Sequence, residues 1–174
     1  MRTVWRAGVP AVLAIALLAS GCSSSSGGSP SGPPATGVPS VTIDPATLQQ
    51  LAAQYLAIAK PANERLEDAN DGFEDHQKDD LRAAVADLRS QAATERWFDR
   101  HLLGIKFPPS IAAIAAAIVS ANNTRIQLTE MQARSRTLAQ LRGFDRMHAD
   151  ADAAVEAPVR AMRKALGLPP PSTS

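Results

Sequence analysis

Aromatic residues, cysteine and long apolar runs are all scarce in this sequence of 174 residues. Seven residues are aromatic and one is cysteine, so neither a disulfide framework nor a metal site built from several cysteines is available. The shortage of aromatic and β-branched strand formers argues against an all-β fold. No apolar run reaches the roughly 18 residues that a membrane-spanning helix needs.

Alanine, in contrast, occurs 33 times, and arginine outnumbers lysine by 14 to 4. Because alanine is the strongest helix former, this composition predicts an all-α fold. Apart from Arg2 and Arg6, the chain has 16 basic and 17 acidic side chains. A near-neutral chain of this kind gives no electrostatic reason to expect nucleic acid as a partner.

Residues 1–21 have the layout of an export signal peptide. Arg2 and Arg6 precede the apolar run AVLAIALL at 11–18, which is too short to anchor stably in a bilayer. The residues that follow, LASGC at 18–22, resemble the lipobox of bacterial lipoproteins. In that family the cysteine receives a diacylglyceryl group and the peptide is cut before it. The resemblance implies a lipid on Cys22; the alternative is an ordinary secretory signal in which this cysteine is incidental.

Residues 22–43 are predicted to be a flexible linker behind the lipidated cysteine. Between positions 23 and 40, 15 of 18 residues are Ser, Gly or Pro, a composition that does not join a packed core. Two acyl chains suffice for stable anchoring where one does not. We therefore expect the membrane as a partner through the N-terminal lipid, and a location on its extracytoplasmic face.

Residues 44–168 have one composition and are predicted to form an up-down four-helix bundle. Asp44 and Pro45 are a typical N-cap and first helical residue, and Gly167 a typical terminator. Between them, apolar side chains recur every three or four residues along four segments. Residues 169–174 are expected to be a Pro-rich tail.

Finer boundaries follow from Gly and Pro positions. The first helix is expected to kink or split at Ile58–Ala62, around Pro61, and its end is expected at Gly72 and the polar run that follows to Lys78. Asp79 or Asp80 is the predicted cap of the second helix, and Pro109 is predicted to open the third. The fourth is expected to run from a cap at Ser135 or Thr137 to Leu166, with a bend at Pro158.

Three stretches of this domain carry a second resemblance. They are YLAIAKPAN at 55–63, FPP at 107–109 and LGLPPP at 166–171. These stretches resemble small exported helical proteins of actinobacteria, most of which have no assigned activity. The resemblance implies an exported helical domain and supplies no activity.

The most unusual feature is residues 64–80, with eight acidic and two basic side chains. Five of the acidic residues fall at three- and four-residue spacing and therefore share one helix face: Glu64, Glu67, Asp68, Asp71 and Asp75. This acidic face either binds a divalent cation, with Glu67 and Asp71 as candidate ligands, or is a solvated face opposite the apolar stripe. Residues 68–72 do not have the spacing of an EF-hand loop.

Asp145, His148 and Asp152 form a second candidate metal site, because they lie on one face of the predicted fourth helix. Di-iron bundles use a Glu-x-x-His pair on each of two helices, whereas this chain has a single Asp-x-x-His. The alternative is that His148 is hydrogen-bonded within a helix interface. Trp97 is a candidate contact residue, and a buried Asn122 is expected to fix helix register.

The sequence holds no phosphate-binding glycine loop, no G-x-S-x-G elbow and no plausible Ser/His/Asp arrangement. We therefore predict a non-enzymatic lipoprotein without a cofactor, which contacts a protein or polymer of the cell envelope. The alternative is a bundle that binds a metal or a small ligand through the acidic helix at 64–80 or through His148.

Overall fold

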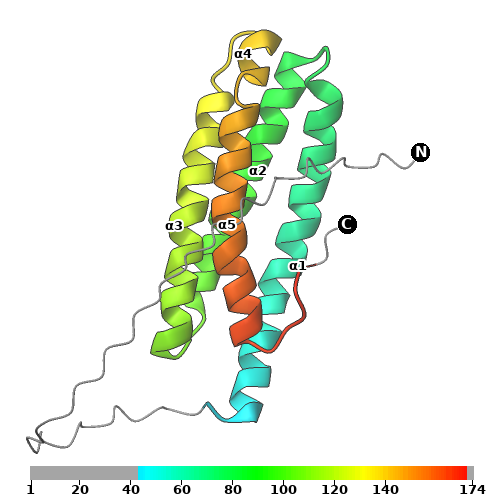
Figure 1. Ribbon diagram of the computed structural model, residues 1–174. Coiled ribbons are helices and arrows are strands. Elements are labelled where there is room, and N and C mark those ends of the chain that lie inside the picture. The colour runs from blue at the N-terminus through cyan, green and yellow to red at the C-terminus, as the bar shows by residue number, and fades with distance from the viewer. Residues whose placement is uncertain (1–42, 172–174) are drawn as a thin grey trace, which may run out of the picture. The chain divides into compact units, whose positions relative to one another are not determined.

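The computed structural model describes residues 43–171. Its elements there are α1 (Pro45–His76), α2 (Leu81–Gly104), α3 (Pro109–Gln132), the short α4 (Leu138–Arg142) and α5 (Asp145–Ala165). The four long helices lie side by side and alternate in direction, with α4 at the end of the bundle where the chain passes from α3 to α5 (Figure 1). This arrangement confirms the predicted all-α bundle. The predicted signal peptide, Cys22 and the Ser/Gly/Pro-rich stretch of the predicted linker at 23–40 lie outside the described residues.

The first two helices begin at the capping residues that the sequence indicates. Asp44 Oδ2 accepts a hydrogen bond from the backbone N–H of Thr47 at 3.0 Å, and Pro45 opens α1. Asp80 Oδ1 likewise accepts from the N–H of Ala83 at 2.9 Å. Each carboxylate satisfies a backbone donor that has no partner inside its helix. Of the two candidate caps for α2, the structure selects Asp80.

The far end of α5 is closed by Gly167. Its φ of 67° is left-handed, which costs glycine little and other residues more. The N–H groups of Leu168 and Gly167 then turn back to the carbonyls of Arg163 and Lys164 at 2.8 and 3.1 Å. These two bonds are those of a Schellman motif. They direct Leu168 onto the core cluster of the bundle.

The first helix ends at His76, within the predicted stretch from Gly72 to Lys78, whereas the predicted alternative of a split at Pro61 is wrong. α1 passes through both Pro61 and Gly72. A Cβ atom at position 72 would lie 3.0 Å from Asp87 Oδ1. Gly72 therefore allows α1 and α2 to approach closely, and it does not terminate a helix.

The predicted continuous fourth helix is also wrong, because the chain breaks into α4 and α5 around Gly143 and Phe144. Thr137 caps α4, as one of the two predicted candidates. In an unbroken helix the carbonyl of Leu141 would bond to the N–H four residues later. Here that carbonyl accepts instead from Gln132 Nε2 of α3 at 2.8 Å. The side chain of Gln132 thus replaces the helical bond and stabilises the break.

The core runs along the bundle axis and is rich in small side chains. α1 packs on α2, α2 on α3, and α3 on α5. Alanines occupy buried positions in each of the four long helices, as at Ala62, Ala92, Ala115 and Ala151. The two outer helices of this series, α1 and α5, make fewer direct contacts with each other than those three pairs do. The seam between them is therefore the most open side of the bundle. None of the described helices has the length and apolar character needed to cross a membrane.

Candidate binding cavity

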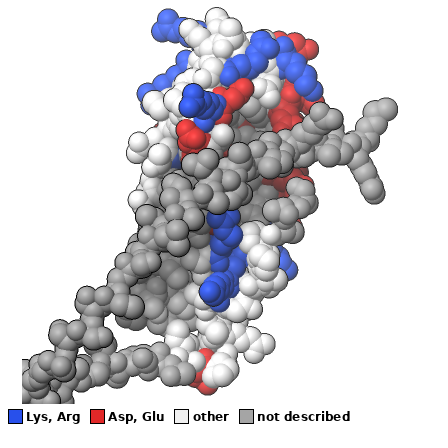
Figure 2. Space-filling model, viewed as in Figure 1, with Lys and Arg blue, Asp and Glu red and all other residues white. Residues whose placement is uncertain are grey.

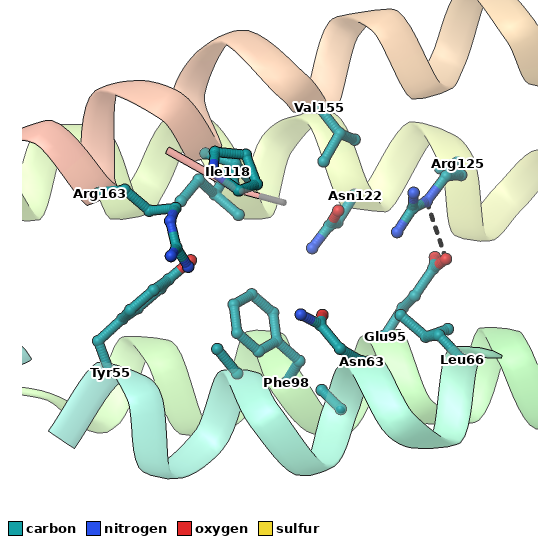
Figure 3. A pocket seen from close by; sticks show the side chains of 14 residues that line it. Tyr55, Asn63, Leu66, Glu95, Phe98, Ile118, Asn122, Arg125, Val155 and Arg163 are labelled. Carbon is teal, nitrogen blue, oxygen red and sulfur yellow. Dashed lines mark ion pairs between the residues drawn. The ribbon is translucent and has the colours of Figure 1, made fainter. Parts of the chain in front are cut away.

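A cavity of about 220 Å³ lies in the seam between α1 and α5. All four long helices contribute to its walls (Figure 3). The apolar part of the lining is Tyr55, Ala59, Ala62, Leu66, Phe98, Ile118, Val155, Val159 and Pro171, and the polar part is Asn63, Glu95, Asn122, Arg125 and Arg163. Mostly apolar walls with a few convergent polar groups are typical of a small-molecule site.

One end of the cavity is formed by polar side chains from α2 and α3. Glu95 and Asn122 are only 4% and 3% exposed. Asn122 donates from Nδ2 to Asp99 Oδ1 at 2.7 Å, one turn along α2 from Glu95. Arg125 places Nε 2.8 Å from Glu95 Oε1 and donates from Nη1 to Asp152 Oδ1 of α5 at 3.2 Å. The cluster therefore joins three helices.

The polar cluster is incompletely hydrogen-bonded. Within residues 43–171, no partner is found for Glu95 Oε2, Asp99 Oδ2, Asn122 Oδ1 or Arg125 Nε. The Nε atom of Arg125 is close to Glu95, but its N–H is not aligned for a hydrogen bond. A buried polar atom without a partner costs about 1–3 kcal/mol. Such atoms are few in native proteins and are usually met by water or by a ligand.

Burial also shifts the acid–base behaviour of this cluster. Desolvation raises the pKa of Glu95 to about 7, against the opposing effect of the Arg125 charge. Desolvation raises the pKa of Asp99 as well, although the hydrogen bond from Asn122 acts in the other direction. Near neutral pH, Glu95 therefore passes between its charged and uncharged forms.

The opposite end of the cavity carries Tyr55 of α1 and Arg163 of α5 (Figure 3). Arg163 donates from Nε to the carbonyl of Pro169 at 2.6 Å. Pro171 then lines the cavity beside residues of α1. The segment expected to be a tail beyond the bundle thus crosses from α5 toward α1 and borders the cavity (Figure 1).

Sequence reasoning did not identify Glu95, Asp99 or Arg125, although a signal for the first two was present. Buried positions on α2 follow the steps of three and four that define a core stripe: Leu88, Ala92, Glu95, Asp99 and Leu102. Two carboxylates therefore occupy core positions, where acidic side chains are rarely buried unless they are paired. Asn122, which was expected to be buried, is indeed part of this layer.

The acidic face of α1 lies elsewhere. Glu64, Glu67, Asp68, Asp71 and Asp75 are all exposed. Asp75 is paired with Lys78 at 2.9 Å. His76 binds Asp87 Oδ2 through Nδ1 at 2.7 Å, and this hydrogen bond raises the pKa of His76. The face is therefore a solvated surface crossed by local ion pairs.

Charges of both signs cover the end of the bundle that carries α4. Figure 2 shows Lys and Arg side chains gathered there, with Asp and Glu side chains next to them. The exposed arginines around α4 are Arg134, Arg136, Arg142 and Arg146. Mixed charge of this kind does not create a strong field of one sign.

His148 is half-buried on α5 and lies against α3. Its Nε2 is 2.7 Å from Gln132 Oε1. Because the same Gln132 donates through its amide nitrogen to Leu141, its oxygen accepts, and His148 Nε2 carries the hydrogen. Burial lowers the pKa of His148, so the neutral ring is favoured. His148 therefore supports the α4–α5 break through Gln132.

The other candidate residues are spread over the surface. Asp145 and Asp152 are exposed, and Asp152 binds Arg125. In the part of the chain that the structure describes, no three His, Cys, Asp or Glu side chains come together as a metal site would require. Trp97 is half-buried, with the Arg65 guanidinium 5.0 Å from its ring centroid and His101 stacked on it at 4.2 Å.

Comparison of the chain with family models, with curated proteins and with solved structures finds no match.

Proposed function

We propose that this chain is a lipid-anchored protein of the extracytoplasmic face of the cell membrane, attached through Cys22. Its helical domain acts as a non-enzymatic binding module that holds a small ligand in the cavity between α1 and α5. This proposal joins the two functions that the sequence suggests, a lipoprotein module and a small-ligand bundle. The acidic face of α1 and the Asp145–His148–Asp152 set have no part in it.

The observation that carries the binding proposal is the set of unpaired polar atoms beside the cavity. Glu95 and Asn122 are each more than nine-tenths buried, line the cavity, and hold an oxygen that no group in residues 43–171 satisfies. Filling these core positions with leucine would remove the desolvation penalty. A few polar groups in a mostly apolar cavity are typical of a small-molecule site.

The anchor proposal is supported by the order of segments in the sequence. A stretch with the layout of an export signal, a cysteine in a lipobox-like context and a Ser/Gly/Pro-rich segment follow one another before the first helix. Such an order is typical of a folded domain held near a membrane surface. A protein or polymer of the cell envelope is the predicted partner that the anchored domain contacts.

Replacing the acyl acceptor tests the anchor. Cys22→Ser should move the protein from the membrane fraction to the soluble fraction, or leave it unprocessed, because two acyl chains supply the binding energy. Ser26→Ala, which alters the linker without touching the cysteine, is the matched control. A Cys22→Ser protein that is cleaved normally and still sediments with membranes would overturn the anchor.

Three six-carbon probes test the cavity: hexylamine, hexanol and hexanoate. Each is added to the full chain and to Ala59→Leu, a variant whose larger side chain occupies part of the cavity. Ala59 lines the cavity and is 6% exposed. At least one probe should raise the melting temperature of the parent protein and have less effect on Ala59→Leu. If none of the three does so, the binding proposal fails.

A further inference from the structure

Building on the proposed binding function, we infer that the ligand of this cavity is a small organic ammonium ion. Its N–H groups donate to Glu95 Oε2 and Asn122 Oδ1, which are covered in this structure and reach the ammonium group once the two side chains turn toward the cavity. Its apolar part lies along Phe98, Ile118 and Val155. This inference adds a ligand class to the site; the acidic face of α1 has no role in it.

Hydrogen-bonding capacity points to a ligand that donates. Of the four buried atoms without a partner among residues 43–171, three are acceptor oxygens: Glu95 Oε2, Asp99 Oδ2 and Asn122 Oδ1. The fourth, Arg125 Nε, already lies 2.8 Å from Glu95 Oε1. A primary ammonium group has three donors and no acceptor. It matches this surplus of acceptors, whereas a carboxylate or phosphate would add acceptors to it.

The balance of charge also points to a cation. The charged groups that face Glu95 are Asp99 on its own helix, Arg125 from α3 and Asp152 from α5. α1 contributes only uncharged side chains to the cavity wall. Arg125 is shared between Glu95 and Asp152, while Asp99 is bonded to the neutral amide of Asn122. At this end of the cavity, the single positive charge of Arg125 therefore lies near three carboxylates, those of Glu95, Asp99 and Asp152.

The second arginine of the cavity does not reverse this balance. Arg163 lies toward the end that carries Tyr55, away from Glu95 (Figure 3). Its Nε is held by the carbonyl of Pro169 at 2.6 Å. The apolar wall of the cavity connects the end that carries Glu95 with the end that carries Arg163. On α1 the lining extends from Tyr55 to Leu66, which is about 16 Å along a helix.

The remaining walls suit the body of such an amine. In Figure 3, Asn122 and Val155 point into the cavity from one side, and Phe98 and Asn63 point into it from the other. Phe98 packs edge-on against Tyr55, with ring centroids 6.3 Å apart. An alkyl or aryl chain can therefore replace water along this surface while its charged end reaches the polar cluster. A bare metal ion would lack that apolar contact.

The test compares affinities of the three probes for the full chain by calorimetry at pH 8. Hexylamine should bind at least about tenfold more tightly than hexanol or hexanoate, because charged hydrogen bonds are the strong ones. Trimethylhexylammonium keeps the charge but has no N–H donor, so it should lose most of this advantage. Hexylamine affinity should also fall as the pH drops below about 7, where Glu95 takes up a proton.

Substitutions test whether Glu95 is the residue that binds the ammonium group. Glu95→Gln preserves shape and should reduce hexylamine binding by about tenfold or more without affecting hexanol. Glu130→Gln is the matched control, since Glu130 forms a half-exposed ion pair with Arg96 outside the cavity. Should Glu95→Gln fail to fold, the pH dependence and the trimethyl probe still decide the question on the parent protein.

The outcomes separate the ligand class from the existence of the site. If hexanol or hexanoate binds as tightly as hexylamine or more tightly, and Ala59→Leu still weakens that binding, the ligand is not a cation. The cavity then remains a binding site. Equal binding of hexylamine and its trimethyl analogue overturns the hydrogen-bonding role of Glu95 and Asn122. If no probe binds in an Ala59→Leu-sensitive way, both the inference and the binding proposal fail.

Discussion

The acid–base behaviour of Glu95 is strongly changed by its surroundings, because this acidic side chain is buried. Glu95 is 4% exposed and has one cationic partner, Arg125, which it shares with Asp152. Removing a carboxylate from water favours its neutral form, and a partial ion pair offsets only part of that effect. The carboxyl group is therefore sensitive to pH in the neutral range.

This raised pKa predicts that lowering the pH stabilises the fold through Glu95. The folded protein binds the proton up to about pH 7, whereas the ordinary value is 4.5. Stability from this group is complete below pH 4.5 and is lost as the pH rises through 7. The free energy of unfolding, measured by urea titration, should lose as much as about 3 kcal/mol over that range. Glu95→Gln should lack this contribution.

The comparison should be made as the difference between the two proteins, because other groups titrate nearby. Desolvation raises the pKa of Asp99 and so adds a trend of the same sign. Burial lowers the pKa of His148, so its stabilising effect is complete above pH 6.5 and is lost as the pH falls below that value through the lower pKa of the folded state. A difference between parent and Glu95→Gln that does not change between pH 4.5 and 7 would contradict the prediction.

His148 acts through packing and hydrogen bonding. His148→Ala should lower the free energy of unfolding by about 1–3 kcal/mol, because Gln132 loses its partner and a half-buried side chain is deleted. His101→Ala is the control, since His101 is exposed and its hydrogen bond and ring contact are both with Trp97 of its own helix. Equal effects of the two substitutions would show that the Gln132 contact contributes nothing.

At the scale of helices, the ends are defined by backbone conformation as much as by side chains. Both Gly167 and Gly104 have open space where a Cβ atom would be added. They differ in backbone: Gly167 has a φ of 67°, and Gly104 is the last residue of α2 with no positive φ. The two positions therefore form a matched pair for testing backbone strain without steric clash.

Gly167→Ala should destabilise the protein by about 1 kcal/mol, because a side chain is strained in the left-handed conformation. Gly104→Ala should be neutral or should stabilise by up to about 1 kcal/mol, since alanine restricts the unfolded chain and favours a helix. Thermal melting of both variants measures the effects. Effects of the same sign would indicate that the end of α5 does not depend on its backbone conformation.

At the scale of the whole molecule, charge is distributed so that the surface and the cavity behave differently. Exposed carboxylates of α1 are solvated, and surface ion pairs contribute little to stability. The buried carboxylates of α2 lie where an interaction with a ligand is strongest, since the surrounding dielectric is lower. Binding is therefore expected at the cavity and not at the more acidic face of α1.

A metal titration checks this expectation on the full chain. Zinc, calcium or iron at micromolar concentration should leave the melting temperature unchanged, because the acidic face is not preorganised. A metal binder would gain about 2.7 kcal/mol at a hundredfold excess over its dissociation constant. A reproducible gain that disappears in Glu67→Gln/Asp71→Asn or in His148→Ala would overturn the expectation.

The helical class, the bundle and most helix starts can be predicted from the amino-acid sequence. Local chemistry is sufficient for these features: Asp44, Asp80 and Thr137 cap helices with their own side chains, and Gly167 stops α5 through its own φ. The export signal, the linker and the lipid on Cys22 are predicted from local composition and stay predictions.

Features that depend on contacts between two helices become visible only in the folded protein. A Cβ atom at position 72 would lie 3.0 Å from Asp87 Oδ1 of α2, so Gly72 allows the two helices to pack closely. Gln132 of α3 donates a hydrogen bond to the carbonyl of Leu141, which stabilises the break in the predicted fourth helix. The cavity depends on Glu95 and Asn122 facing the open α1–α5 seam. Spacing along one helix places a side chain on a face, but the neighbouring helix determines whether that face is solvated, paired or part of a binding site.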